Sequence, residues 1–287
     1  MNALESRVSR RSFFTTAGGV AAGFGISRLS GTAQAAEVLP LPALPWGPAY
    51  FPATGLNPDV VRKSAYCIYY KDGGCAHAAA QSIIDALGDA LEAAGATDNP
   101  WRLLPRKLYS YAGGGVVGWG TICGSLNGAI GVMGILGVHG KLGNALMDYY
   151  STTALPTNAL ARYVPPAGIP APLSSVVSNV SNSPLCHNSM SLWAAAARVP
   201  VTHPSNKDRC AKLVGDIVYR AVELMNDSFS GINPPAWVPP ENYAGCYNCH
   251  IKADMIPSQQ GKMDCLECHD VAPAHGSWRK RKGNGGG

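Results

Sequence analysis

Residues 75–94 have the sequence CAHAAAQSIIDALGDALEAA, and residues 207–227 have the sequence KDRCAKLVGDIVYRAVELMND. In the first stretch, one helical face carries the apolar residues Ile83, Ile84, Leu87 and Leu91. In the second, apolar residues alternate at spacings of four and three: Cys210, Val214, Ile217, Ala221 and Leu224. Both stretches therefore predict amphipathic helices, and Asp208 suits the first turn of the second. Because no convincing strand alternation or internal repeat occurs elsewhere, we predict an all-α fold.

The composition divides the chain after residue 35 into three zones. Residues 36–57 are rich in proline and predict an extended lead-in. Residues 58–228 predict a helical domain that holds five cysteines. Residues 229–287 have two Pro-Pro pairs, four further cysteines and a Gly/basic end, without apolar periodicity. We therefore expect an irregular, cofactor-binding C-terminal segment.

The N-terminus predicts an export signal over residues 1–35. Residues 9–14 read SRRSFF, a Gly/Ala-rich apolar stretch follows, and Ala33-Gln34-Ala35 provides a small-x-small cleavage site. This order resembles a twin-arginine signal, so we expect a periplasmic protein. The apolar stretch is too short and too rich in glycine to predict a membrane span.

The charge of the chain gives no reason to expect a nucleic-acid partner. The 23 basic and 18 acidic residues give +5, but four arginines and one glutamate lie in residues 1–35, which leaves the rest near neutral. The one basic run in the rest, Arg279-Lys280-Arg281-Lys282, is typical of a solvated tail. The alternative is a docking patch for an acidic redox partner protein.

Residues 108–138 contain no charged side chain. One interpretation is a membrane helix in which Gly120, Gly124 and Gly128 pack closely. We favour a buried helix in the helical domain, because ten glycines between 113 and 137 dilute the apolarity that membrane insertion needs. The glycine ridge would let another backbone or a cofactor approach, and Cys123 lies within it.

Two C-x-x-C-H motifs carry the strongest chemical signal. They are Cys246-Tyr247-Asn248-Cys249-His250 and Cys265-Leu266-Glu267-Cys268-His269. In such motifs both thiols bond to the porphyrin and the histidine ligates the iron. The four cysteines also fit a zinc ribbon, but histidine is rare in this chain, 7 of 287 residues, and it follows both pairs. We therefore predict two haem c groups, with His250 and His269 as proximal ligands.

The short tether between His250 and Cys265 predicts that the two haems lie close together and act as one unit. Each iron needs a sixth ligand. The candidates are His275, His187 and His139, with Met255 and Met263 as thioether alternatives. We favour His275 because it lies in a tail with no evident core. His77 and His203 are weaker candidates.

Five cysteines remain upstream: Cys67, Cys75, Cys123, Cys186 and Cys210. Disulfides or inert buried thiols are one interpretation, although five is an odd number. The other is a two-iron or four-iron sulfur cluster held by Cys75, Cys123, Cys186 and Cys210, with Cys67 as a possible substitute. A cluster inserted in the cytoplasm would also explain an export route that moves folded proteins.

Four segments now resemble a known family. They are Gly73-Gly74-Cys75-Ala76, residues 113–124, Leu185-Cys186-His187-Asn188-Ser189 and Arg209-Cys210-Ala211. With the signal and both haem motifs, this order resembles the split-Soret cytochromes c, which join a C…GCAxxG…C…C domain to a dihaem segment. The resemblance implies a homodimer, stacked haems with two histidine ligands each, and an iron–sulfur site in the helical domain. One departure is Ala79, where the family pattern has glycine.

Electron transfer is the function that these features favour, because no catalytic apparatus is evident. We expect single electrons to pass through two close haems and an iron–sulfur cluster to redox partner proteins. One alternative is a small multihaem reductase, an enzyme with one open haem position for nitrite or peroxide. Another is that the helical domain is purely structural and serves dimerisation.

Overall fold

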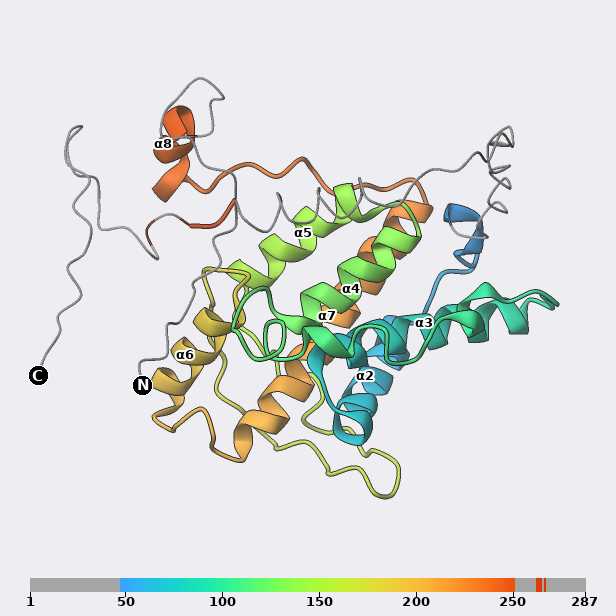
Figure 1. The fold of residues 1–287 in the computed structure, drawn as a ribbon, viewed down its shortest axis with the longest axis horizontal. Coiled ribbons are helices and arrows are strands. Elements are labelled where there is room, and N and C mark those ends of the chain that lie inside the picture. The colour runs from blue at the N-terminus through green and yellow to red at the C-terminus, as the bar shows by residue number, and fades with distance from the viewer. Residues whose placement is uncertain (1–46, 251–261, 265, 267–287) are drawn as a thin grey trace, which may run out of the picture. The chain divides into compact units, whose positions relative to one another are not determined.

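The computed structural model describes residues 47–250, 262–264 and 266 (Figure 1). Its α-helices are α2 (Pro58–Asp72), α3 (Cys75–Ala93), α4 (Gly124–Ile135), α5 (His139–Thr152), α6 (Cys186–Ala197), α7 (Ser205–Phe229) and α8 (Glu241–His250). Three short 3-10 helices, η1 (Pro48–Tyr50), η2 (Pro100–Leu103) and η3 (Ser110–Ala112), lie in the connections. Within the described residues, strand-like pairing is limited to two isolated bridges. The predicted all-α fold is confirmed.

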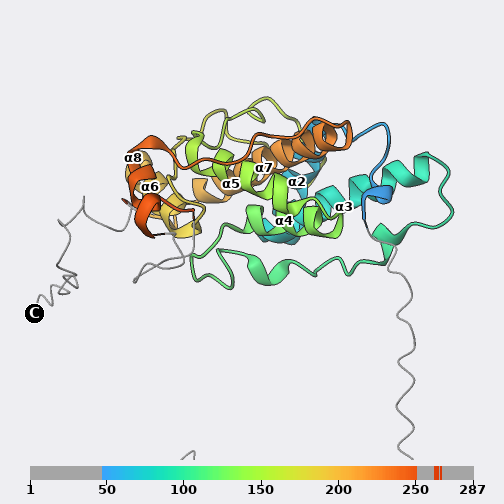
Figure 2. The same ribbon diagram turned by 90° about the horizontal axis from the view of Figure 1, so that it is seen from above.

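The long helix α7 packs against α2, α3, α4 and α5 (Figure 1 and Figure 2). Its predicted apolar face is buried, with Val214, Ile217 and Ala221 inaccessible to solvent. Burying each large apolar side chain stabilises the fold by about 1.5–3 kcal/mol. The observed helix runs two residues beyond the predicted range at each end, and Asp208 lies in its first turn as expected. Helix α7 is therefore the element around which the others assemble.

The predicted helix at residues 75–94 corresponds to α3, which starts at Cys75. Gly73 and Gly74 before it have φ of 75° and 81°, a conformation that glycine adopts at no steric cost. Helix α4 packs on α3 through two glycines. A Cβ added to Gly124 would lie 2.9 Å from Cβ of Cys75, and one added to Gly128 would lie 2.2 Å from the Ala76 carbonyl oxygen. The two helix backbones thus meet where no other residue fits.

The charge-free stretch differs from the predicted single helix. Only its second half is helical, as α4, while Gly120 lies in a loop and Cys123 is the N-cap of the helix. Ten glycines explain the difference, because those at 113–120 favour turns over helix. Helix α4 is buried, as we favoured, with Leu126 and Met133 inaccessible to solvent. Across the described ranges, no helix has the length and apolarity needed to span a membrane.

Buried polar groups of α7 fasten the long connection between α5 and α6. The Asp216 carboxylate accepts hydrogen bonds from the backbone N–H and the hydroxyl of Thr157, at 2.7 and 2.8 Å. The Lys212 ammonium donates to the Asn158 side chain at 3.2 Å, and the Asp208 carboxylate accepts from the Leu173 N–H at 3.2 Å. Such hydrogen bonds compensate the buried charges for the solvation by water that they lose. The connection is therefore held on α7 by three residues of one helix face.

The C-terminal segment is less irregular than we predicted. Helix α8 carries the first C-x-x-C-H motif and ends at its histidine, His250. It follows Pro239-Pro240 and has Glu241 in its first turn, which suits a helix N-terminus. Ten residues without an apolar stripe gave no periodic signal, so the pattern of the sequence missed it. The second motif lies outside the described residues except for Leu266.

The contact between α3 and α4 predicts that one methyl group added at Gly128 strongly lowers the stability of the fold. Gly128→Ala should lower the free energy of unfolding by about 1–3 kcal/mol, because the new Cβ overlaps the α3 backbone. The matched control is Gly140→Ala in α5, where an added Cβ meets nothing within 4 Å. This control should leave stability unchanged or raise it by up to about 1 kcal/mol. Urea unfolding of both variants measures the difference, and equal midpoints would contradict the close approach.

Candidate functional site

Three of the four candidate cluster cysteines occupy helix N-termini. Cys75 is the first residue of α3, Cys123 is the N-cap of α4 and Cys186 is the first residue of α6. The partial positive charge of a helix N-terminus favours a thiolate there. Cys210 lies in the second turn of α7, so the four thiols come from four helices. Cys123 is buried, and the other three are partly exposed.

A short antiparallel bridge between Ile122 and Leu185 joins the segments that lead into α4 and α6. The Cys123 N–H donates to the Pro184 carbonyl at 2.9 Å, and the Cys186 N–H donates to the Thr121 carbonyl at 2.7 Å. The two cysteines therefore sit on neighbouring backbone segments. Because Gly124 also lies against Cys75, the starts of α3, α4 and α6 gather in one region.

The glycine-rich loop before Cys123 is tightly folded. The Thr121 N–H donates to the Gly115 carbonyl at 3.0 Å, and an added Cβ on Gly115 would lie 2.6 Å from the Thr121 nitrogen. Val116 and Val117 have φ of 60° and 51°, which is rare and strained for β-branched residues. Such strain persists where the surrounding structure imposes it, often at functional sites. The loop thus fixes the backbone that leads to Cys123.

The thiols influence one another electrostatically. A hydrogen bond from the Cys75 thiol, and then the nearby Arg209 guanidinium, lower the pKa of Cys210. The same hydrogen bond, together with burial, raises the pKa of Cys75, and Cys123 and Cys186 add to this effect. Burial, followed by the charges of Cys123 and Cys210, raises the pKa of Cys186 to about 12. The four predicted cysteines are therefore electrostatic neighbours.

The donor chemistry fits an iron–sulfur cluster, although the side chains are not arranged as a finished metal site. Across the described ranges, no three His, Cys, Asp or Glu side chains stand at metal-binding spacing. Two thiols have other polar contacts, Cys123 with the Ser125 hydroxyl at 3.2 Å and Cys210 with the Asn206 side chain at 3.3 Å. Four neighbouring thiols on helix ends nevertheless form a set of soft ligands that suits iron–sulfur chemistry.

Two buried polar groups beside the thiols have no hydrogen-bond partner: the Tyr150 hydroxyl and Nε of Arg209. Both side chains are almost fully buried. Burial and then the Cys123 thiolate raise the pKa of Tyr150, and burial and then Cys210 raise that of Tyr69. Unpaired buried donors are rare and often face an ion or ligand that completes their bonding. The thiol region therefore has donors suited to a negatively charged group.

Sequence reasoning missed Arg209, Tyr150 and Tyr69. For Arg209 a signal was present, since it is a charged residue directly before Cys210 in the amphipathic helix pattern. The two tyrosines gave no such signal, because their proximity to the thiols arises from helix packing.

The candidate sixth ligands for the haems are widely separated along the chain. His187 follows Cys186 in α6 and is exposed, and His139 is exposed at the start of α5. His77 is buried in α3, with its Nε2 at 3.7 Å from an Asp72 carboxylate oxygen. His275, the candidate we favoured, lies outside the described residues, as do Met255 and the haem-motif residues Cys265, Cys268 and His269. In the first motif, Cys246 is partly exposed.

A cavity of about 450 Å³ lies between the helical domain and the C-terminal segment. Ile122 and Pro184, which adjoin Cys123 and Leu185, line it from the helical domain. Trp237, Tyr243 and Met263 line it from the C-terminal segment. The rings of Tyr243 and Trp237 both lie within 6 Å of Tyr247 in the haem motif, at 5.6 and 5.7 Å.

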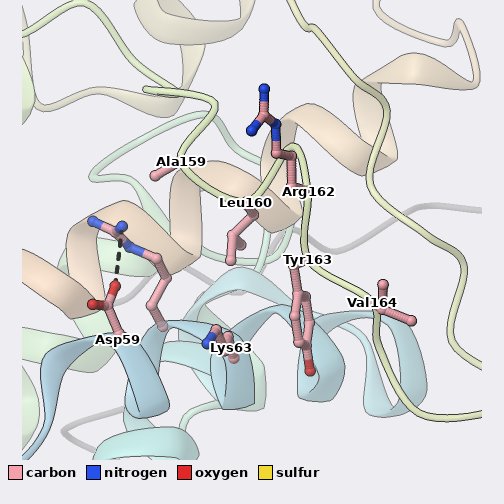
Figure 3. Close-up of a pocket in the computed structure, with 8 residues that line it drawn as sticks. Asp59, Lys63, Ala159, Leu160, Arg162, Tyr163 and Val164 are labelled. Atoms are coloured by element: carbon pink, nitrogen blue, oxygen red, sulfur yellow. Dashed lines mark hydrogen bonds and ion pairs between the residues drawn. The ribbon is translucent and has the colours of Figure 1, made fainter.

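A second hollow lies between α2 and the connection from α5 to α6, and Figure 3 shows it. Asp59 and Lys63 line it from α2, and Tyr163 extends along α2 from the opposite side (Figure 3). The Tyr163 hydroxyl is 3.3 Å from the Cys67 thiol. Cys67, the possible substitute ligand, therefore contacts a residue that lines this hollow. The other four cysteines influence the pKa values of one another.

Known proteins resemble this chain in both sequence and structure. Residues 77–224, just over half of the chain, match the model of a family described as "Putative redox-active protein (C_GCAxxG_C_C)". The chain belongs to this family. The match covers Cys123, Cys186 and Cys210 and begins two residues after Cys75.

The split-Soret cytochrome c of Desulfovibrio desulfuricans is 29% identical to this chain over 227 residues, which span 76% of this chain and 77% of the relative. A solved structure from the same organism, described as "A novel iron centre in the split-Soret cytochrome c", superposes with a TM-score of 0.64 at 27% identity. The superposition covers 76% of this chain and 89% of the solved chain. The resemblance seen in the sequence is confirmed, and the chain is a homologue of split-Soret cytochrome c.

The opposite pKa shifts of Cys210 and Cys186 predict an order of thiol reactivity in metal-free protein. Cys210 should be alkylated at lower pH than Cys186, because its pKa is lowered while that of Cys186 is raised. Cys75→Ala removes the donor, so the pH midpoint for alkylation of Cys210 should rise. Mass spectrometry after iodoacetamide labelling across a pH series measures both midpoints.

The matched control for this test is Cys67→Ala, which removes a thiol that contacts Tyr163. It should leave the Cys210 midpoint in place. An equal shift in the two variants would show that the Cys75–Cys210 hydrogen bond does not set the reactivity.

Proposed function

We propose that the protein is an exported electron-transfer protein that carries two covalent c-type haems and an iron–sulfur cluster. The observation that carries this proposal is the gathering of Cys75, Cys123, Cys186 and Cys210 from four helices, in a homologue of a cytochrome with an iron centre. Both kinds of group accept and release single electrons when bound.

The haem part of the proposal rests on the two C-x-x-C-H motifs. Cys246 and Cys249 would hold one haem and Cys265 and Cys268 the other, with His250 and His269 as proximal ligands. Helix α8 ends at His250, so the ligand closes the helix that carries its cysteines. Trp237, Tyr243 and Met263 supply an apolar environment for a porphyrin beside α8. His275, His187 and His139 remain the proposed sixth ligands.

The cluster part rests on the thiols and the buried donors around them. The four cysteines would bind the iron, with Cys67 as the possible substitute for one of them. The Tyr150 hydroxyl and Arg209 Nε are buried without partners and suit the sulfur atoms of a cluster. Whether the cluster has two or four irons depends on the ligand geometry of the loaded protein.

The cavity beside α8 supports electron exchange between the two kinds of cofactor. One wall contains Ile122, which precedes Cys123, and Pro184, which accepts a hydrogen bond from Cys123. The opposite wall contains Trp237 and Tyr243, which lie beside the haem motif. Both cofactor segments thus border the same cavity.

The proposed location follows from the N-terminal signal. The twin-arginine pattern at residues 9–14 would direct the folded chain to the periplasm. We further propose a homodimer that exchanges electrons with redox partner proteins, as the resemblance to the split-Soret cytochromes c implies.

The cluster is tested by metal analysis of anaerobically purified protein. We expect at least about four irons per chain together with acid-labile sulfide, which are two haem irons plus the irons of a cluster. Cys123→Ser should remove the sulfide and the excess iron but leave the covalent haems. Cys67→Ser tests the substitute ligand: retained cluster iron would show that Cys67 is not required, and lost cluster iron would identify it as a ligand. Two irons without sulfide in the wild type would refute the cluster.

The haems are tested by mass and absorption spectra. The mature chain should carry the mass of two haem groups, and Cys265→Ala with Cys268→Ala should remove one of them because both thioether bonds are lost. The reduced protein should show low-spin spectra and bind no carbon monoxide without denaturation. High-spin haem or ready carbon monoxide binding would favour the multihaem reductase.

A further inference from the structure

Helix α7 buries four ionisable side chains: Asp208, Arg209, Lys212 and Asp216. Three of them have a partner of opposite charge. Lys212 lies 3.1 Å from Asp208, and Asp216 lies 3.7 Å from Arg62. A buried charge without a counter-charge is costly, so such pairing is the rule. Arg209 is the exception on this helix.

The contacts of Arg209 are with neutral groups and with the Cys210 thiol. Its guanidinium donates to the backbone carbonyl of Ser189 at 3.2 Å, to the Ser189 hydroxyl and to the Asn179 side-chain oxygen at 3.4 Å. It also lies 3.5 Å from the Met190 sulfur and 3.9 Å from the Cys210 sulfur. Nε has no partner, and within the described part of the chain no carboxylate forms an ion pair with Arg209.

Arg209 cannot escape this situation by losing its proton. A guanidinium stays protonated in proteins, so the charge remains in a side chain that is only 2% exposed. The contacting group that can become negative is the Cys210 thiol, whose sulfur lies 3.9 Å from the guanidinium. The geometry therefore directs an unbalanced positive charge at the thiol region.

We propose that Arg209 is the buried counter-charge of the cysteine-bound iron–sulfur cluster and that it raises the reduction potential of this cluster. The inference rests on the proposed function and deepens it, since it assigns a tuning role to a residue that binds no iron. Arg209 is thus a positioning residue that acts on the cluster through its charge.

The direction of the change in reduction potential follows from the charge balance of one electron transfer. In the proposed transfer, a bound ferrous haem would give one electron and become ferric, and one ferric iron of a bound cluster would become ferrous. No covalent bond forms or breaks, and the cluster gains one negative charge. The fixed positive charge of Arg209 stabilises the reduced cluster more than the oxidised cluster. Burial keeps this interaction from being screened by salt.

The first test compares the full-length haem-loaded protein with Arg209→Gln and Arg209→Lys. At a fixed electrode potential, Arg209→Gln should raise the ratio of oxidised to reduced cluster about tenfold or more, which corresponds to about 59 mV for one electron. Arg209→Lys keeps the charge and should stay within about threefold of the wild type. Redox titration followed by electron paramagnetic resonance measures the cluster apart from the haems.

Arg220→Gln is the matched control, since it removes a positive charge from the same helix. Arg220 is about one-third exposed and pairs with Glu223 at 3.1 Å. It should leave the cluster ratio within about threefold of the wild type, because solvent screens an exposed charge. A shift as large as that of Arg209→Gln would overturn the proposal.

A second pair of variants tests the effect of the Arg209 charge on the cluster if Arg209→Gln does not fold or does not bind the cluster. Ser189→Asp places a carboxylate beside the guanidinium and neutralises it, while Ser189→Asn provides a neutral side chain of the same size. The aspartate variant should raise the oxidised fraction several-fold more than the asparagine variant. Equal ratios in these two variants would overturn the proposal.

Metal analysis separates this inference from the proposed function. A wild type without labile sulfide refutes the cluster and the role of Arg209 together. A wild type with sulfide, but with the same cluster potential in all Arg209 and Ser189 variants, refutes the role of Arg209 alone. If the cluster potential falls whenever the positive charge at Arg209 is removed or neutralised from Ser189, the result supports both the cluster and the role of Arg209.

Discussion

The close packing of α3 on α4 is the constraint on which the thiol region depends. At Gly124 and Gly128 the two helix backbones approach to distances at which an added Cβ would overlap the α3 segment Cys75–Ala80. Because Gly124 directly follows Cys123 and faces Cys75, this contact sets the start of one cysteine-bearing helix against the other. The positions of two thiols are thus a consequence of helix packing, and a side chain at either glycine would move them apart.

The other two thiols are positioned by different means. The bridge between Ile122 and Leu185 brings Cys186 beside the segment that leads to Cys123, with two backbone hydrogen bonds. Cys210 belongs to α7, whose apolar face is fixed by burial against four other helices. The same helix anchors the connection from α5 to α6 through Asp208, Lys212 and Asp216. Its four buried charges therefore divide into three that have an opposite charge beside them and hold the fold, and one cation at the thiols with no carboxylate partner among the described residues.

The sequence allowed the helical class, the start of α3 and the span of α7 to be predicted, because apolar spacing depends only on local periodicity. It also singled out the four cysteines by their helix positions. It placed Gly120 and Cys123 inside a helix, since a glycine-rich, charge-free stretch has no pattern that separates a tight loop from a buried helix. The proximity of Tyr69, Tyr150 and Arg209 to the thiols depends on contacts between distant segments, which periodicity does not encode.

The unpaired charge bears on the order in which the protein would be completed. A buried guanidinium without a counter-charge destabilises the helical domain, and negative thiolates or a cluster would relieve that cost. Under the proposed function, the domain should therefore gain stability when a cluster is inserted, before export by a route that accepts folded proteins. Cys246 of the first haem motif is partly exposed in α8. Cluster insertion in the cytoplasm and haem attachment after export are thus compatible with one chain, and the buried charge favours that order.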